Sequence, residues 1–185
     1  MYKYLLLLTL LSTHSRASEI NIVSGLSQPL VVNGGNLEIN YLTENLIFEY
    51  SHGWSLDFAA HGGLAQTEAE NDQNLELFLP YSTGGGIGYR LSKQFNARLE
   101  YKEHYYEVNR KNSDESFQYI TRSLGIGLYW EWQPWQNMLL IVPSLRYWPN
   151  LNSSLAGDKF ELADGEIHKA HDQGLFANVS IGCKF

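Results

Sequence analysis

The stretch GLFANVSIGCKF, at residues 174–185, alternates between apolar side chains and polar or small ones. The apolar set is Leu175, Ala177, Val179, Ile181, Cys183 and Phe185, and the opposite set is Asn178, Ser180, Gly182 and Lys184. Successive side chains of a strand point to opposite sides, so a period of two over this length predicts a β-strand with two unlike faces.

The same alternation recurs along the rest of the chain and divides it into eight strands. They are expected at about residues 19–26, 36–42, 46–66, 74–90, 94–108, 116–132, 138–148 and 172–185. The connections between them alternate: those at 43–45, 91–94 and 133–137 are short, whereas those at 27–35, 67–73, 109–115 and 149–171 are longer and polar. An even number of strands with alternating short and long connections predicts an all-β, eight-stranded antiparallel up-and-down barrel.

Composition excludes several classes of protein. The 185 residues carry a net charge of −7, which argues against nucleic acid as a partner, and one cysteine cannot form an internal disulfide. The mean hydropathy is −0.28, and beyond the N-terminus the longest apolar run is MLLIVP at residues 138–143. A membrane-spanning helix needs about 20 apolar residues, so a multi-helix membrane protein is excluded.

The first residues, MYKYLLLLTLLSTHSRAS, are typical of a secretory signal peptide. Lys3 supplies the positive charge, Leu5 to Leu11 the apolar core, and Ser15 and Ala17 the small residues before a cleavage site. A membrane anchor would need a much longer apolar run. We therefore expect a signal peptide at 1–17 and a single domain at 18–185.

The polar faces of the strands combine glycine with charges of both signs. An eight-stranded barrel is only wide enough inside for side chains, so paired long charges would fill it as a plug. The apolar faces would then point outward, which only lipid favours, whereas a soluble ligand-binding barrel would have its apolar face inside. The side chains assigned to the interior are Glu38, Glu49, Asp57, Glu76, Arg90, Arg98, Glu100, Lys102, Glu131, Arg146 and Lys184.

Aromatic residues gather near the ends of the expected strands, as in the two girdles of a membrane barrel. The set at the short-turn end is Tyr41, Tyr89, Phe95, Trp130, Trp132, Trp135 and Phe185. The set toward the long loops is Trp54, Tyr105, Tyr106, Phe117, Tyr119, Tyr147 and Trp148. The alternative is that Tyr and Trp are simply common in strands.

With these features the mature chain resembles the small eight-stranded outer-membrane barrels of Gram-negative bacteria. The resemblance implies a transmembrane barrel with short periplasmic turns and longer extracellular loops, surrounded by outer-membrane lipids. In that family, a C-terminal aromatic residue that closes an alternating strand is the signal read by the barrel-assembly machinery, and Phe185 matches it. Val179 and Ile181 also match, whereas Cys183 stands where a bulkier residue is more usual.

Three functions follow from this interpretation. The first is a non-enzymatic membrane protein with a plugged interior, whose surface loops act in envelope integrity or adhesion on an unidentified surface ligand. The alternatives are a narrow pore or small-molecule binding barrel, and a lipid-modifying enzyme. Lipid A deacylases carry a His and a Ser two residues apart, but none of His52, His61, His104, His168 and His171 has Ser at that distance. We assign no catalytic residue.

Three other features have a simple structural interpretation. The loop at 149–171 with Asp172 holds carboxylates and imidazoles that could bind a divalent cation, but their spacing fits no ligand motif, so a solvated acidic loop is expected. His104 fits either a protonation switch or a hydrogen-bonded filler. Cys183 is expected to face lipid as an apolar filler. We predict no metal and no cofactor.

Overall fold

The computed structural model describes residues 18–135 and 138–185 of the chain, so the predicted signal peptide lies outside the described residues. Eight antiparallel strands follow one another around a barrel, which the pairing of β5 with β6 closes. The strands are β1 (Glu19–Gly25), β2 (Gly35–Leu42), β3 (Leu46–Asp57), β4 (Leu75–Arg90), β5 (Phe95–Arg110), β6 (Ser116–Trp130), β7 (Leu139–Trp148) and β11 (Gly174–Lys184). The predicted fold is confirmed.

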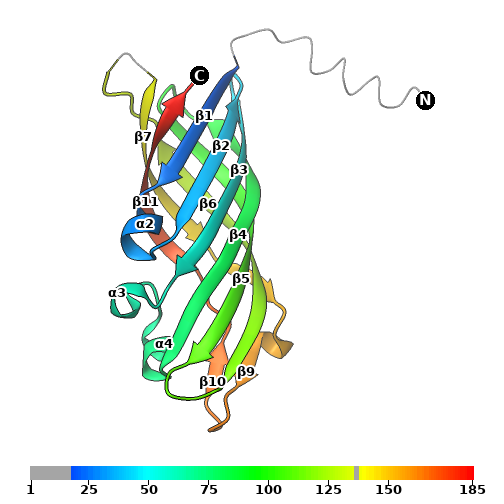
Figure 1. Ribbon diagram of the computed structural model, residues 1–185. Coiled ribbons are helices and arrows are strands. Elements are labelled where there is room, and N and C mark those ends of the chain that lie inside the picture. The colour runs from blue at the N-terminus through cyan, green and yellow to red at the C-terminus, as the bar shows by residue number, and fades with distance from the viewer. Residues whose placement is uncertain (1–17, 136–137) are drawn as a thin grey trace, which may run out of the picture.

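The two ends of the barrel differ, as the alternating connections predict. The C-terminus and the start of β1 lie at one end, with the short turns, and the small elements lie at or toward the other end (Figure 1). These elements are α2 (Ser27–Val31), α3 (Ala60–Gly63), α4 (Glu68–Asp72), β8 (Asn150–Ser153), the 3-10 turn η1 (Ala156–Asp158), β9 (Lys159–Glu161) and β10 (Ile167–Lys169). None of the described helices is long and apolar enough to cross a membrane.

Strand parity sorts the side chains as the sequence predicts. On β5, Arg98, Glu100 and Lys102 are almost fully buried inside the barrel, whereas Leu99 and Tyr101 are about half exposed on its outer surface. Apolar side chains of the neighbouring strands continue this outer surface, and Ile126 is 63% exposed. The barrel is therefore apolar outside and charged inside at mid-height.

The expected strand at 46–66 is too long: β3 ends at Asp57, and α3 and α4 follow. Before that end, the parity of β3 and β4 changes. Trp54 and Ser55 are both exposed, and Ser55 has a left-handed φ of 53°. On β4 the register against β5 shifts between Phe78 and Tyr81. The register shift places one extra residue in β4, so the side chains before it and after it alternate in opposite phase.

This change of parity fills the long-loop end of the barrel with apolar side chains. Beyond it, Leu56, Leu75, Leu77 and Leu79 point inward and are buried. We call this the extracellular core, since it lies at the long-loop end. Its buried members are Val32, Leu56, Phe58, Leu75, Leu77, Leu79, Tyr106, Val108, Tyr119 and Leu162.

Candidate functional site

Arg98, on β5, is the centre of a polar network inside the barrel. One terminal nitrogen of its guanidinium, Nη1, lies 2.7 Å from Glu38 Oε1 on β2 and 3.0 Å from Glu49 Oε2 on β3. The same nitrogen donates to Asn40, and Nε donates to Asn96. The guanidinium also lies over the Tyr129 ring, 3.8 Å from its centroid. One buried cation thus joins four strands of the barrel.

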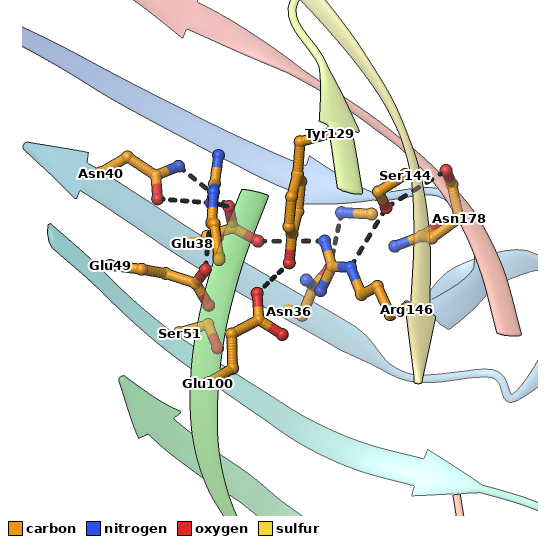
Figure 2. A network of polar contacts seen from close by, with 12 residues as sticks. Asn36, Glu38, Asn40, Glu49, Ser51, Glu100, Tyr129, Ser144, Arg146 and Asn178 are labelled. Atoms are coloured by element: carbon orange, nitrogen blue, oxygen red, sulfur yellow. Dashed lines mark hydrogen bonds and ion pairs between the residues drawn. The ribbon is translucent and has the colours of Figure 1, made fainter. Parts of the chain in front are cut away.

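Two more cations and a third carboxylate complete the network. Lys102 Nζ lies 2.5 Å from Glu49 Oε1, and Arg146 Nη2 lies 3.2 Å from Glu38 Oε2. Glu100 accepts hydrogen bonds from the Tyr129 hydroxyl and from Trp148 Nε1. Three cations therefore face three carboxylates, and Arg146 also lies over the Tyr129 ring, 4.8 Å from its centroid (Figure 2). Such a network leaves each charge paired or hydrogen-bonded, as burial requires.

Glycine makes room for this network on β6. A Cβ at Gly125 would collide with the Trp148 ring, and one at Gly127 would collide with the Tyr129 ring. Both glycines point inward, between Ser123 and Tyr129. The glycines on the inward face of β6 therefore leave room for Trp148 and Tyr129 to pack inside the barrel.

The structure distributes the predicted interior charges over three levels. Glu38, Glu49, Arg98, Glu100, Lys102 and Arg146 form the central network. Glu131 is buried nearer the short-turn end, where the Asn96 side chain donates a hydrogen bond to its carboxylate. Arg90 and Lys184 lie at the short-turn rim, 3.5 and 2.7 Å from the Glu19 carboxylate.

The prediction that Asp57 and Glu76 face the interior is wrong, because both lie on the long-loop side of the change of parity in their strands. Asp57 is partly buried and pairs with Phe78 on the outer side, where its carboxylate accepts from the Ala59 backbone N–H. Glu76 is exposed and lies 3.9 Å from Lys111.

The prediction of an aromatic girdle toward the long loops is also partly wrong. Trp54 and Tyr147 are about half exposed on the outer wall, but Tyr106, Tyr119 and Trp148 are buried inside. Phe117 packs against the extracellular core and stacks on Phe160. Parity decides the difference, since Tyr106 and Tyr119 continue the inward rows of β5 and β6.

The loop at 149–171 is not simply a solvated acidic loop. Its hairpin of β9 and β10 places Leu162 in the extracellular core, and His168 and His171 are 1% and 5% exposed. His171 Nδ1 lies 2.8 Å from Glu70 Oε1, and Glu70 also closes a capping box with Thr67 at the start of α4. The acidic residues Asp158, Glu161, Asp164 and Glu166 remain exposed. Within the described residues no three His, Cys, Asp or Glu side chains gather as a metal site.

Burial and hydrogen bonding shift two pKa values at this end. Burial raises the pKa of Glu70, but the hydrogen bond and charge of His171, with the Thr67 bonds, outweigh it and leave the pKa below its ordinary 4.5. Burial lowers the pKa of His168 below its ordinary 6.5. Because both pKa values are lower in the folded protein, the unfolded chain takes up these protons at a higher pH. Both groups therefore contribute less to the stability of the fold as pH falls.

We expect acidification to loosen the extracellular hairpin in two steps. Proteolysis at 150–173 should accelerate as pH falls below about 6.5, through His168, and again below about 4.5, through Glu70. Timed digestion by an acid-tolerant protease, corrected for the protease's own pH profile, measures both steps. The variant His168→Gln should lack the first step and keep the second. An equal cleavage rate from pH 7 to 4 would contradict the assignment.

His104 lies inside the barrel, 1% exposed, with its Nδ1 2.8 Å from Ser82 Oγ. Its Nε2 has no hydrogen-bond partner among the described residues. A Ser–His–acid hydrolase needs a carboxylate on the second ring nitrogen to orient the base. The Ser82–His104 pair therefore does not form such a triad within the described part of the chain.

These observations define the fold type. The barrel closes with eight antiparallel strands, and its charged side chains point inward from an apolar outer wall. The chain has the fold of the small transmembrane β-barrels.

Comparisons with known proteins find similarity in solved structures alone. No protein-family model and no curated protein sequence matches the chain. The N-terminal β-barrel domain of Pseudomonas aeruginosa OprF is similar, with a TM-score of 0.49 and 14% identity over 91% of this chain and 96% of that one. The attachment invasion locus protein Ail of Yersinia pestis has a TM-score of 0.47 and 14% identity over 92% and 100% of the two chains. Neisserial surface protein A has a TM-score of 0.43 and 8% identity over 90% and 92%.

Proposed function

We propose that the protein is an integral outer-membrane β-barrel that conducts neither ions nor solutes, catalyses no reaction, and acts through its extracellular end in envelope integrity or adhesion. The observation that carries this proposal is the filled interior. The Arg98 network crosses the barrel at mid-height, and the extracellular core fills the space between this network and the long-loop end.

The outer wall supports a membrane location. Leu128 and Leu145 are 56% and 49% exposed, and similar side chains surround the barrel on its other strands. In water, a contiguous apolar surface of this extent would favour aggregation, whereas lipid tails cover it without cost.

The charge of the extracellular end indicates what kind of surface partner it suits. The segments 58–76, 107–116 and 149–173 hold twelve acidic and four basic residues. An acidic surface attracts cations and basic ligands and repels polyanions. We therefore propose a positively charged partner for the loops. Binding of the folded protein to lysine-rich peptides should weaken as salt rises from 50 to 500 mM; equal binding to polyanions such as heparin would contradict the proposal.

Conductance distinguishes this function from a narrow pore. In a planar lipid bilayer, the purified protein should give no stable conductance step, because the Arg98 network and the extracellular core both block the lumen. A reproducible open level, present in every insertion, would overturn the closed barrel. The enzyme alternative is tested on lipid A extracted from cells with and without the gene. An identical mass spectrum is expected, and a lost or added acyl chain would contradict a non-enzymatic role.

We propose that Phe185 is read during assembly by the barrel-assembly machinery. Its backbone N–H donates to the carbonyl of Ile20 on β1, and its side chain is 61% exposed. Phe185→Ala keeps the backbone bonds but removes the ring. We expect a several-fold lower level of the variant in the outer membrane, with an unchanged denaturation midpoint for the molecules that fold. Wild-type levels would contradict the proposal.

A further inference from the structure

The barrel wall has a notch beside the N-terminal end of β11. β7 pairs with β11 along residues 174–183, but on the other side β1 pairs only along 180–184. Beyond this pairing, Leu26 N–H donates to the Val179 carbonyl, and Ser27 bonds the Asn178 side chain. The chain then turns away into α2. Residues 174–177 of β11 therefore face α2 across a gap that no β1 residue spans.

A cavity of about 400 Å³ lies behind this notch. α2 and the two residues that follow α3, Leu64 and Ala65, border it on one side and the start of β11 on the other, and most of its lining residues are apolar. At its mouth, Leu64, Leu175 and Ala177 are exposed on the outside of the molecule. The lining of the cavity thus extends from the barrel interior, at Ser82 and His104, to the outer wall, at Leu175 and Ala177.

The inner end of the cavity is polar. Ser82 and His104 line it, and the Nε2 of His104 has no partner although the residue is 1% exposed. If the Ser82 hydroxyl donates to Nδ1, Nε2 carries a proton that needs an acceptor; in the other tautomer, Nε2 needs a donor. A buried polar atom of this kind is destabilising when it stays unpaired.

We propose that this cavity binds one fatty acid, with the carboxyl group at Ser82 and His104 and the acyl chain leaving through the notch toward the lipid. A carboxyl group accepts hydrogen bonds and, when protonated, also donates one, so it satisfies either tautomer of His104. The volume lies at the small end of the range for ligand pockets, roughly 300–1,000 Å³, which suits one chain and not a two-chain phospholipid. The entry route rests on the membrane location proposed above.

Dodecanoic acid labelled with ¹³C at its carboxyl carbon tests this site. The protein is placed in phospholipid nanodiscs, its folding is checked by heat-dependent gel migration, and the acid is titrated against empty nanodiscs. We expect a saturable, shifted carboxyl signal. Ala177→Trp, which fills the mouth, and His104→Leu, which removes the polar contact, should each weaken binding at least tenfold. Val179→Trp is the matched control, since Val179 lies two residues along on the same outer face and outside the cavity, and its affinity should stay within twofold.

Each outcome decides between the two proposals. Folded protein without saturable binding overturns the fatty-acid site and leaves the membrane barrel standing. Equal affinity of Ala177→Trp and the wild type overturns the lateral mouth, and equal affinity of a folded His104→Leu overturns the carboxyl contact. Protein that does not fold into nanodiscs overturns the membrane location and the fatty-acid site with it.

Discussion

Arg98→Ala is expected to lower the free energy of unfolding by about 3–5 kcal/mol, the usual cost of removing one partner of a buried ion pair. The substitution leaves Glu38 and Glu49 without their shared cation, in an interior where both carboxylates are at most 6% exposed. It also removes the contact with the Tyr129 ring. Urea unfolding in lipid vesicles, followed by tryptophan fluorescence, measures the loss.

The control for this change is Arg122→Ala. Arg122 pairs with Glu103 at 3.1 Å, but its side chain is 42% exposed, so its loss should cost about 0–1 kcal/mol. If Arg98→Ala costs less than half of the expected value, or no more than the control, water fills the interior and the plug is wrong.

Leu77→Ala is expected to cost about 2–5 kcal/mol, the range for removing a leucine side chain from a packed core. Leu77 is fully buried in the extracellular core. We expect the damage to be local, because the Arg98 network lies below this core. Faster hydrogen exchange of the backbone amides at the long-loop end, with unchanged protection at mid-barrel, would show that the damage is local. Unfolding in urea gives the total loss.

Ile167→Ala serves as the control for the core. Ile167 is on β10 at the same end of the barrel but is 45% exposed, so its truncation should change stability by less than about 0.5 kcal/mol. If Leu77→Ala and Ile167→Ala cost the same, the extracellular end has no packed core, and this part of the account fails.

The sequence predicts the barrel because parity alone decides most of it. On β5 one parity runs from Asn96 to Val108 without interruption, so the alternation by itself places Arg98, Glu100 and Lys102 in the interior. The opposite parity gives the apolar outer wall. The alternating lengths of the connections predict which end carries the loops.

The remaining features depend on local irregularities that a pattern of period two does not contain. The left-handed Ser55 and the shifted register near Pro80 reverse the parity of β3 and β4, which moves Asp57 and Glu76 outside. The polar composition of the loop at 149–171 does not indicate that it folds back. The pairing of His171 with Glu70 joins residues 101 positions apart, and only the tertiary fold brings them together.

The location of the folded protein is the most direct test of the account, since the closed barrel, the surface role and the lateral cavity all require a membrane. Cells that express the protein are fractionated, and the fractions are run on a gel with and without boiling. We predict a band in the outer-membrane fraction that migrates differently after boiling, as the barrel unfolds. A single band in the soluble periplasm, insensitive to heat, would contradict the account.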